Sequence, residues 1–171
     1  MTLTAISIVI AATIYCMYNT VSVALFGVPH SLSMTYYHRK NKYKVGFLFP
    51  IMMYLVVAFM MPAWLSMSEG SAFQFLAFLA PAAIAFVGTA PAFLSSDLEN
   101  KVHSISAVIA AVCSLLWVGL VTPYWWITIG IWTIICVLYA LLTKTVKTSY
   151  TYWLETIAFG ATFTATLSYS L

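Results

Sequence analysis

The stretch HRKNKYKVGFLFPIMMYLVVAFMMPAWLSM, residues 38–67, decides the class of the fold. A short segment with one arginine and three lysines is followed by residues 45–67, none of which is charged. An α-helix rises ~1.5 Å per residue, so about 20 apolar residues cross the ~30 Å hydrocarbon core of a bilayer. The stretch therefore predicts a membrane-spanning helix with a basic segment at one end.

The rest of the chain has the same apolar character. Of its 171 residues, 63% are hydrophobic and 6% are charged, whereas a soluble domain carries about 25% charged residues. We predict an all-α, polytopic integral membrane protein, residues 1–171 forming one domain of six antiparallel transmembrane helices. The predicted spans are residues 3–26, 45–67, 73–94, 102–122, 124–143 and 150–171. A transmembrane barrel is disfavoured because barrel strands alternate apolar and polar residues.

The basic residues predict a topology, because all seven fall in every second gap between the apolar stretches. They are Arg39, Lys40, Lys42, Lys44, Lys101, Lys144 and Lys147. Basic loops are retained in the cytoplasm, so loops 27–44, 95–101 and 144–149 are predicted to be cytoplasmic and both termini outside. The N-terminus lacks the positive segment of a cleaved signal peptide. We expect a protein of a plasma membrane of the bacterial inner-membrane type.

Charge and cysteine spacing exclude several function classes. The net charge of +3 comes from the loops and not from a soluble basic face, which excludes nucleic-acid binding. The three cysteines lie far apart in apolar stretches and have no metal-binding spacing. The main interpretation therefore includes no metal and no cofactor, and a metal enters only in one of the alternatives given below. Membrane lipids are the expected partners. Arg39, Lys40, Lys42 and Lys44 would attract anionic headgroups, at about 1 kcal/mol per residue.

Small residues indicate where the predicted helices pack closely. Spans 73–94, 102–122 and 150–171 are rich in small side chains, which let membrane helices approach one another, and we expect them to form the tight centre. One stripe comprises Ser104, Ala107, Ala111 and Ser114, and another Gly160, Thr164 and Ser168. The alternative is a narrow pore lined by hydroxyl groups. In loop 27–44, Ser31 or Ser33 is expected to cap a short interfacial helix.

Most other ionisable residues fall on the predicted cytoplasmic side. The candidates for a ligand or ion path are Glu155, His103, Glu99, Asp97, His30 and Asn19. Glu99 and His103 are four residues apart and would share a helix face. Glu155 lies about one turn inside the last span, where a carboxylate must be paired, protonated or near water. The amide of Asn19 has the alternative role of a hydrogen bond between helices.

The sequence leaves three interpretations of this group open. Glu155 pairs with Lys101, Lys147 or His103 and locks helices together, or the group forms the inner mouth of a transport path. In the third interpretation, Glu99, His103 and Asp97, with His30, bind a metal or act as acid and base on a lipid-like substrate. No catalytic residue is assigned.

The predicted function is therefore that of a small multi-pass membrane protein without enzymatic activity. It would bind or move a small solute, ion or lipid through the cytoplasm-facing polar site. A channel formed by so short a chain needs several copies, so a homo-oligomer is expected. The alternatives are a membrane-embedded enzyme, metal- or acid/base-dependent, acting on a lipid at the cytoplasmic interface, and a structural or regulatory membrane subunit.

Overall fold

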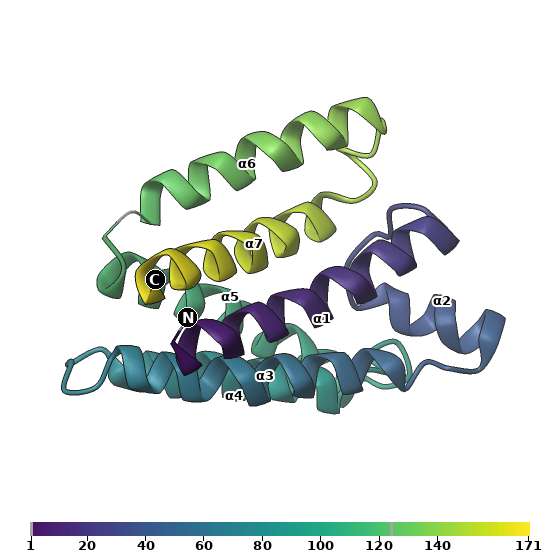
Figure 1. Cartoon of the computed structure of the whole chain (residues 1–171). Coiled ribbons are helices and arrows are strands. Elements are labelled where there is room, and N and C mark those ends of the chain that lie inside the picture. The colour runs from purple at the N-terminus through teal and green to yellow at the C-terminus, as the bar shows by residue number, and fades with distance from the viewer. Residues whose placement is uncertain (1, 124) are drawn as a thin grey trace.

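A computed structural model describes residues 2–123 and 125–171, which form seven α-helices and no strand (Figure 1). The helices are α1 (Leu3–Phe26), α2 (Met34–Tyr43), α3 (Leu48–Met67), α4 (Gln74–Thr89), α5 (Asp97–Val121), α6 (Trp125–Leu142) and α7 (Tyr150–Ser170). The all-α prediction is confirmed. Tyr124, the predicted first residue of the fifth span, lies outside the described residues.

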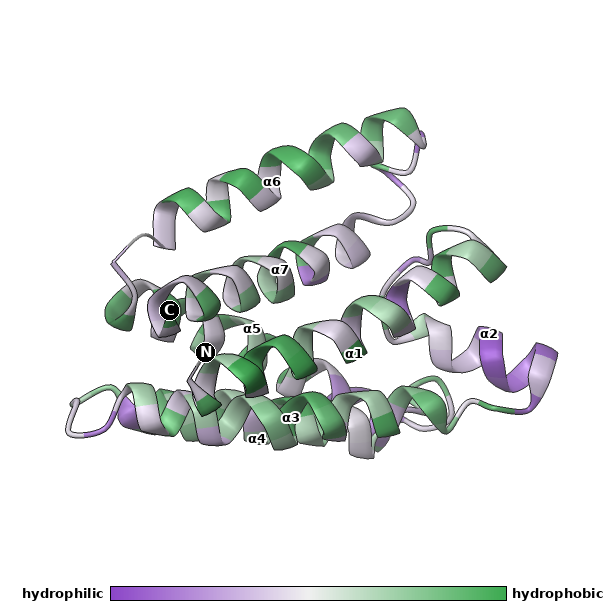
Figure 2. Cartoon of the chain, viewed as in Figure 1, coloured by the Kyte–Doolittle hydropathy of each residue, from purple (hydrophilic) through white to green (hydrophobic). Residues whose placement is uncertain are grey.

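Four of these helices, α1, α3, α5 and α6, are long and apolar enough to cross a membrane. Helix α4 is apolar but has only 16 residues. Helix α7 has 21 residues, but its serine, threonine and tyrosine residues reduce its apolar character. Figure 2 shows hydrophobic residues along most helices and hydrophilic residues gathered on α2. The chain is thus compatible with a membrane protein, whereas the full six-span topology stays a prediction.

Two helix ends differ from the prediction for reasons of backbone chemistry. Helix α5 begins at Asp97, five residues before the predicted start, because the Ser96 hydroxyl accepts a hydrogen bond from the Glu99 N–H at 3.2 Å. A capping hydroxyl and acidic residues in the first turn both stabilise a helix N-terminus. Helix α4 ends at Thr89 rather than at residue 94. Pro91 has no N–H to continue the helix and disfavours helical backbone at Ala90.

The short helix predicted within loop 27–44 is present as α2, but its N-terminus lacks the expected cap. Ser33 precedes the helix, and its side chain makes no capping hydrogen bond. Its hydroxyl instead lies 3.3 Å from that of Ser31. The C-terminus of α2 does have a local cap, because Lys44 adopts a left-handed conformation and its N–H donates to the carbonyl oxygens of Arg39 and Lys40.

Five helices form a closed ring. Helix α3 packs against α1 and α4, α4 packs against α5, and α7 completes the ring by contacting α5 and α1. Helix α6 packs mainly on α7 and lies at the periphery (Figure 1). Of the three spans expected to form the tight centre, 73–94 and 102–122 pack extensively as α4 and α5. Span 150–171, as α7, contacts α5 and also packs against α1 and α6.

The two small-residue stripes have different surroundings. On α7, Gly160 lies against the indole ring of Trp132 from α6, where a Cβ would clash. The Trp132 N–H donates to the Thr164 hydroxyl at 2.9 Å, so this stripe packs α7 on α6. On α5, part of the stripe faces the centre of the ring. There, the parallel indoles of Trp64 and Trp117 stack at 4.5 Å and connect α3 to α5.

Candidate functional site

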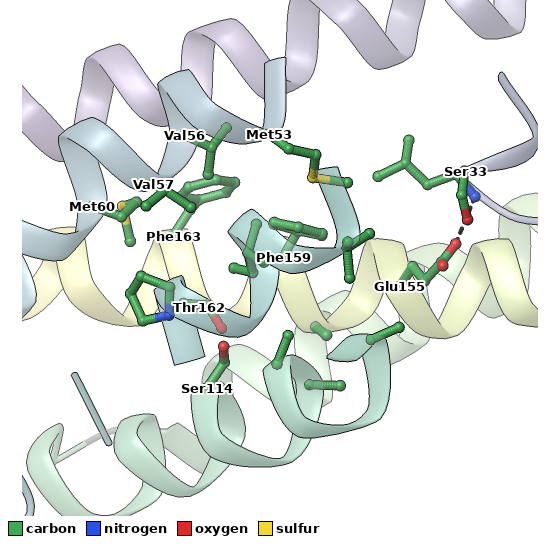
Figure 3. A pocket seen from close by; sticks show the side chains of 18 of the residues that line it. Ser33, Met53, Val56, Val57, Met60, Ser114, Glu155, Phe159, Thr162 and Phe163 are labelled. Atoms are coloured by element: carbon green, nitrogen blue, oxygen red, sulfur yellow. Dashed lines mark hydrogen bonds between the residues drawn. The ribbon is translucent and has the colours of Figure 1, made fainter. Parts of the chain in front are cut away.

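A partly enclosed cavity of about 80 Å³ lies between α3, α4, α5 and α7 (Figure 3). Apolar side chains form most of its wall, including Met53, Val56, Met60, Ile84, Phe159 and Phe163. Leu32 and Ser33, just before α2, line one end. A cavity of this size exceeds what a single water molecule needs. Apolar walls with a few polar groups are typical of sites for small organic ligands.

Glu155 supplies the polar group at the end lined by Leu32 and Ser33. Its side chain projects from α7, and Oε2 accepts a hydrogen bond from the Leu32 backbone N–H at 2.6 Å (Figure 3). No basic side chain in residues 2–123 and 125–171 pairs with this carboxylate. The predicted partners Lys101, Lys147 and His103 are thus replaced by a backbone amide from a segment far away in the sequence.

The start of α7 explains why Glu155 meets Leu32. The Tyr152 N–H donates to the His30 carbonyl oxygen at 3.2 Å. The Ser149 hydroxyl donates to the Val28 carbonyl oxygen at 3.5 Å. These bonds hold the first turn of α7 beside residues 28–32, and the next turn then places the Glu155 carboxylate at the Leu32 N–H.

Two hydroxyl groups form a second polar position, away from Glu155. Ser114 on α5 and Thr162 on α7 both line the cavity, and their hydroxyls point toward one another in Figure 3. Thr162 is 5% exposed, and its Oγ1 has no hydrogen-bond partner among the described residues. A buried hydroxyl without a partner is uncommon, because its desolvation is then uncompensated. It therefore has spare hydrogen-bonding capacity at the cavity wall.

Three of the other candidate residues lie in or near the first turns of α5 and do not line the cavity. Glu99 accepts a hydrogen bond from the Ser95 hydroxyl. Asp97 is exposed in the same turn. His103 is buried, stacks on the Phe93 ring at 4.5 Å, and its Nδ1 lies 2.9 Å from the Ala90 carbonyl oxygen. These contacts join the start of α5 to the segment after α4.

The last two candidates both contact the first turn of α7. His30 is exposed, with its ring 6.1 Å from that of Tyr150. Asn19 is buried on α1, and its Oδ1 accepts a hydrogen bond from the Tyr152 hydroxyl at 3.1 Å. The Asn19 amide thus makes the interhelical bond that the sequence suggested as its alternative role. Of the six candidates, Glu155 is the one that lines the cavity.

The basic residues of α2 divide into one buried and three exposed side chains. Arg39 is 6% exposed and its guanidinium lies 4.5 Å from the Tyr18 ring centroid. It also donates to the Ser22 hydroxyl at 2.9 Å, which attaches α2 to α1. The exposed lysines are Lys40, Lys42 and Lys44. The charges of these lysines are therefore accessible at the surface, whereas that of Arg39 is not.

Sequence reasoning did not assign Leu32, Ser114 or Thr162 to the site. A backbone N–H leaves no signal in a sequence, which explains the omission of Leu32. The spacing of Glu155 and Thr162 does indicate a shared position, because residues seven apart lie on one face of a helix. The stripe that contains Ala107, Ala111 and Ser114 favoured close helix packing, with a pore lined by hydroxyl groups as the alternative, and all three residues line the cavity.

The fold and the cavity define an all-helical protein with four helices compatible with a membrane location and an apolar cavity between helices. Comparisons with protein-family models, curated proteins and solved structures found no match to this chain. Within the part of the chain that the structure describes, no three His, Cys, Asp or Glu side chains are grouped to hold a metal ion.

Proposed function

We propose that this chain is a membrane protein that spans the bilayer six times as a single domain and binds a small, mainly apolar molecule inside its helix bundle. The observation that carries the proposal is the cavity, which has apolar walls and one carboxylate at one end. Ligand sites in proteins combine these two properties, because apolar walls supply burial and a few polar groups orient the ligand.

The six-span topology is supported by helix length and by charge. Helix α4 is ~24 Å long at ~1.5 Å per residue, which a slightly thinned bilayer accommodates. Helix α7 is long enough to cross the bilayer, and its one carboxylate lies near an end. With loops 27–44, 95–101 and 144–149 in the cytoplasm and both termini outside, every basic residue lies on one side.

This topology gives the site an orientation. Glu155 is the sixth residue of α7, so it would lie near the cytoplasmic surface, with the apolar part of the cavity deeper in the bilayer. Lys40, Lys42 and Lys44 are exposed near the same surface and would contact anionic headgroups. A ligand would then enter from the cytoplasm or from the inner leaflet, with its polar end toward Glu155.

Binding of an apolar molecule fits the cavity better than conduction of ions. An ion that leaves water needs a series of oxygen ligands or charges along its path. The side chains with oxygen atoms on the cavity wall are few, namely Ser33, Ser114, Glu155 and Thr162. Met53, Val56, Phe159 and other apolar groups occupy the remaining wall and cannot replace a hydration shell.

Cavity filling tests the proposal. The purified protein is reconstituted in phosphatidylcholine vesicles and labelled with a photoreactive diazirine analogue of n-octanol, and modified residues are mapped by mass spectrometry. Ala111 lines the cavity, so Ala111→Leu is expected to reduce labelling of the cavity residues by more than half. The matched control is Ala58→Leu, because Ala58 is exposed on α3. Equal labelling of both variants and the wild type would refute ligand binding in the cavity.

A further inference from the structure

The charge of the cavity wall restricts the class of ligand, if the cavity is the binding site proposed above. Glu155 is the one ionisable side chain among the described residues that line the cavity. Any net charge on the wall is therefore negative. An anionic ligand would meet the carboxylate with a like charge in a medium of low dielectric, where such repulsion is strong.

The carboxylate also has unused hydrogen-bonding capacity. An ionised carboxylate accepts about four hydrogen bonds. Within the described residues, Oε2 accepts one from the Leu32 N–H, and Oε1 takes part in none of the hydrogen bonds found. A backbone amide supplies a donor but no positive charge. An ammonium group supplies both, and hydrogen bonds between charged groups are about twice as strong as those between neutral groups.

The second polar position sets the length of the ligand. Glu155 and Thr162 are seven residues apart on α7, which corresponds to about 10 Å along the helix axis. Phe159 lies between them, and Met53 and Val56 on α3 contribute to the same apolar wall (Figure 3). The distance between the two polar positions is thus bridged by apolar surface on both helices.

We propose that the cavity binds a primary amine with an apolar body about 10 Å long. Its ammonium group contacts the free oxygen of Glu155, and the far end of its body lies at Ser114 and Thr162. The buried Thr162 hydroxyl, which has no partner among the described residues, hydrogen-bonds a polar group at that end where the ligand carries one. The class is a cationic amphiphile, distinct from a fatty acid or a metal ion.

The test compares three probes of equal chain length: n-octylamine, n-octanol and n-octanoate. Each competes with the photoreactive octanol analogue in vesicles, and its concentration in the membrane phase is measured so that partitioning is removed from the comparison. We expect n-octylamine to protect the cavity residues at an about tenfold lower membrane concentration than n-octanol, since it adds one charge-assisted contact. We expect n-octanoate to be the weakest of the three.

Variants separate the role of the charge from that of the fold. Glu155→Gln keeps the shape and is expected to remove the advantage of the amine while n-octanol still protects. Glu155→Asp keeps the charge and is expected to retain the advantage, which covers the case in which Glu155→Gln fails to fold. The matched control is Glu69→Gln, because Glu69 is exposed after α3.

The outcomes distinguish this inference from the function on which it rests. If n-octanol or n-octanoate protects as well as n-octylamine in the wild type, the cavity binds ligands but the amine class is wrong. The amine class is also wrong if n-octylamine and n-octanol protect equally in the Glu155→Asp variant, which keeps the charge. If none of the three probes protects and Ala111→Leu leaves the labelling unchanged, the proposed binding function itself is wrong.

Discussion

Replacing Gly160 with alanine tests how α6 is held on α7, the helix that carries Glu155. A Cβ at position 160 would lie under 3.0 Å from ring atoms of Trp132, and the rigid indole cannot yield without moving α6. Overpacking of this kind costs roughly 1–3 kcal/mol. The shift would also strain the 2.9 Å hydrogen bond from the Trp132 N–H to the Thr164 hydroxyl.

The chain contains a matched control for this substitution. Gly130 lies within α6, and a Cβ there would meet nothing within 4 Å. Gly130→Ala is therefore expected to be neutral or stabilising, because alanine favours helix over glycine by about 1 kcal/mol. The two variants change the same residue type by the same single methyl group, and only the surroundings differ.

Thermal unfolding in detergent measures the effect through cysteine exposure. Cys113 and Cys136 are buried free thiols, so a thiol-reactive fluorophore reports their exposure on unfolding, after the exposed Cys16 is replaced by serine. About 1 kcal/mol corresponds to roughly 2–4 °C for a chain of 150–250 residues, so Gly160→Ala is expected to lower Tm by about 2–12 °C.

A second substitution shows whether Trp132 causes the loss. In a Trp132→Leu background, the additional Gly160→Ala change is expected to lower Tm by less than half as much as in the wild type. If Gly160→Ala unfolds at or above the wild-type temperature, or if its effect is the same in both backgrounds, the described packing of α6 on α7 is wrong.

Three further predictions concern the α1–α7 contact, the basic segment and the topology. Asn19→Leu removes the 3.1 Å hydrogen bond from Tyr152 and is expected to destabilise the protein by about 0.6 kcal/mol; an unchanged Tm contradicts the contact. Changing Lys40, Lys42 and Lys44 to glutamine is expected to weaken enrichment of phosphatidylglycerol around the protein by about 1 kcal/mol per residue, measured by energy transfer from tryptophan to labelled lipid; unchanged enrichment excludes a headgroup role. Asn41→Cys, with the native cysteines replaced by serine, is expected to react with an impermeant reagent only in permeabilised cells; labelling in intact cells reverses the topology.

Apolar composition predicted the helical class, because a long uncharged stretch in lipid must satisfy its backbone hydrogen bonds internally. The predicted start of α5 and the predicted end of α4 were wrong by five residues each, because a capping serine and a proline determine where these helices begin and end. The Ser96 cap begins α5 early, and Pro91 ends α4 early. Each of these signals acts over a few residues, whereas the hydrophobic pattern extends over a whole span and does not define its exact ends.

The cavity could not be predicted in the same way. Its polar end joins Leu32 to Glu155 across 123 residues of sequence. The small side chains of Ala107 and Ala111 line the middle of the cavity, where they leave space at the centre of the helix ring. Small residues predict either close helix contact or a gap between helices, and the choice depends on how the other helices hold the ring apart. The small residues on α7 make close helix contact, because Gly160 lies against the Trp132 ring of α6.

The basic segment has a structural role besides the topological one that the sequence suggested. Arg39 is buried against Tyr18 and Ser22, so this basic side chain attaches α2 to α1 instead of facing solvent. The Tyr18 hydroxyl pairs with that of Thr35 at 2.7 Å, and the Thr35 hydroxyl lies 2.6 Å from the Leu32 carbonyl oxygen. Contacts thus run from Arg39 through Tyr18 and Thr35 to the carbonyl group of Leu32, the residue whose N–H binds Glu155. Helix α2 is thereby attached to the residue whose N–H binds the Glu155 carboxylate, so the geometry at the polar end of the cavity depends on the position of α2.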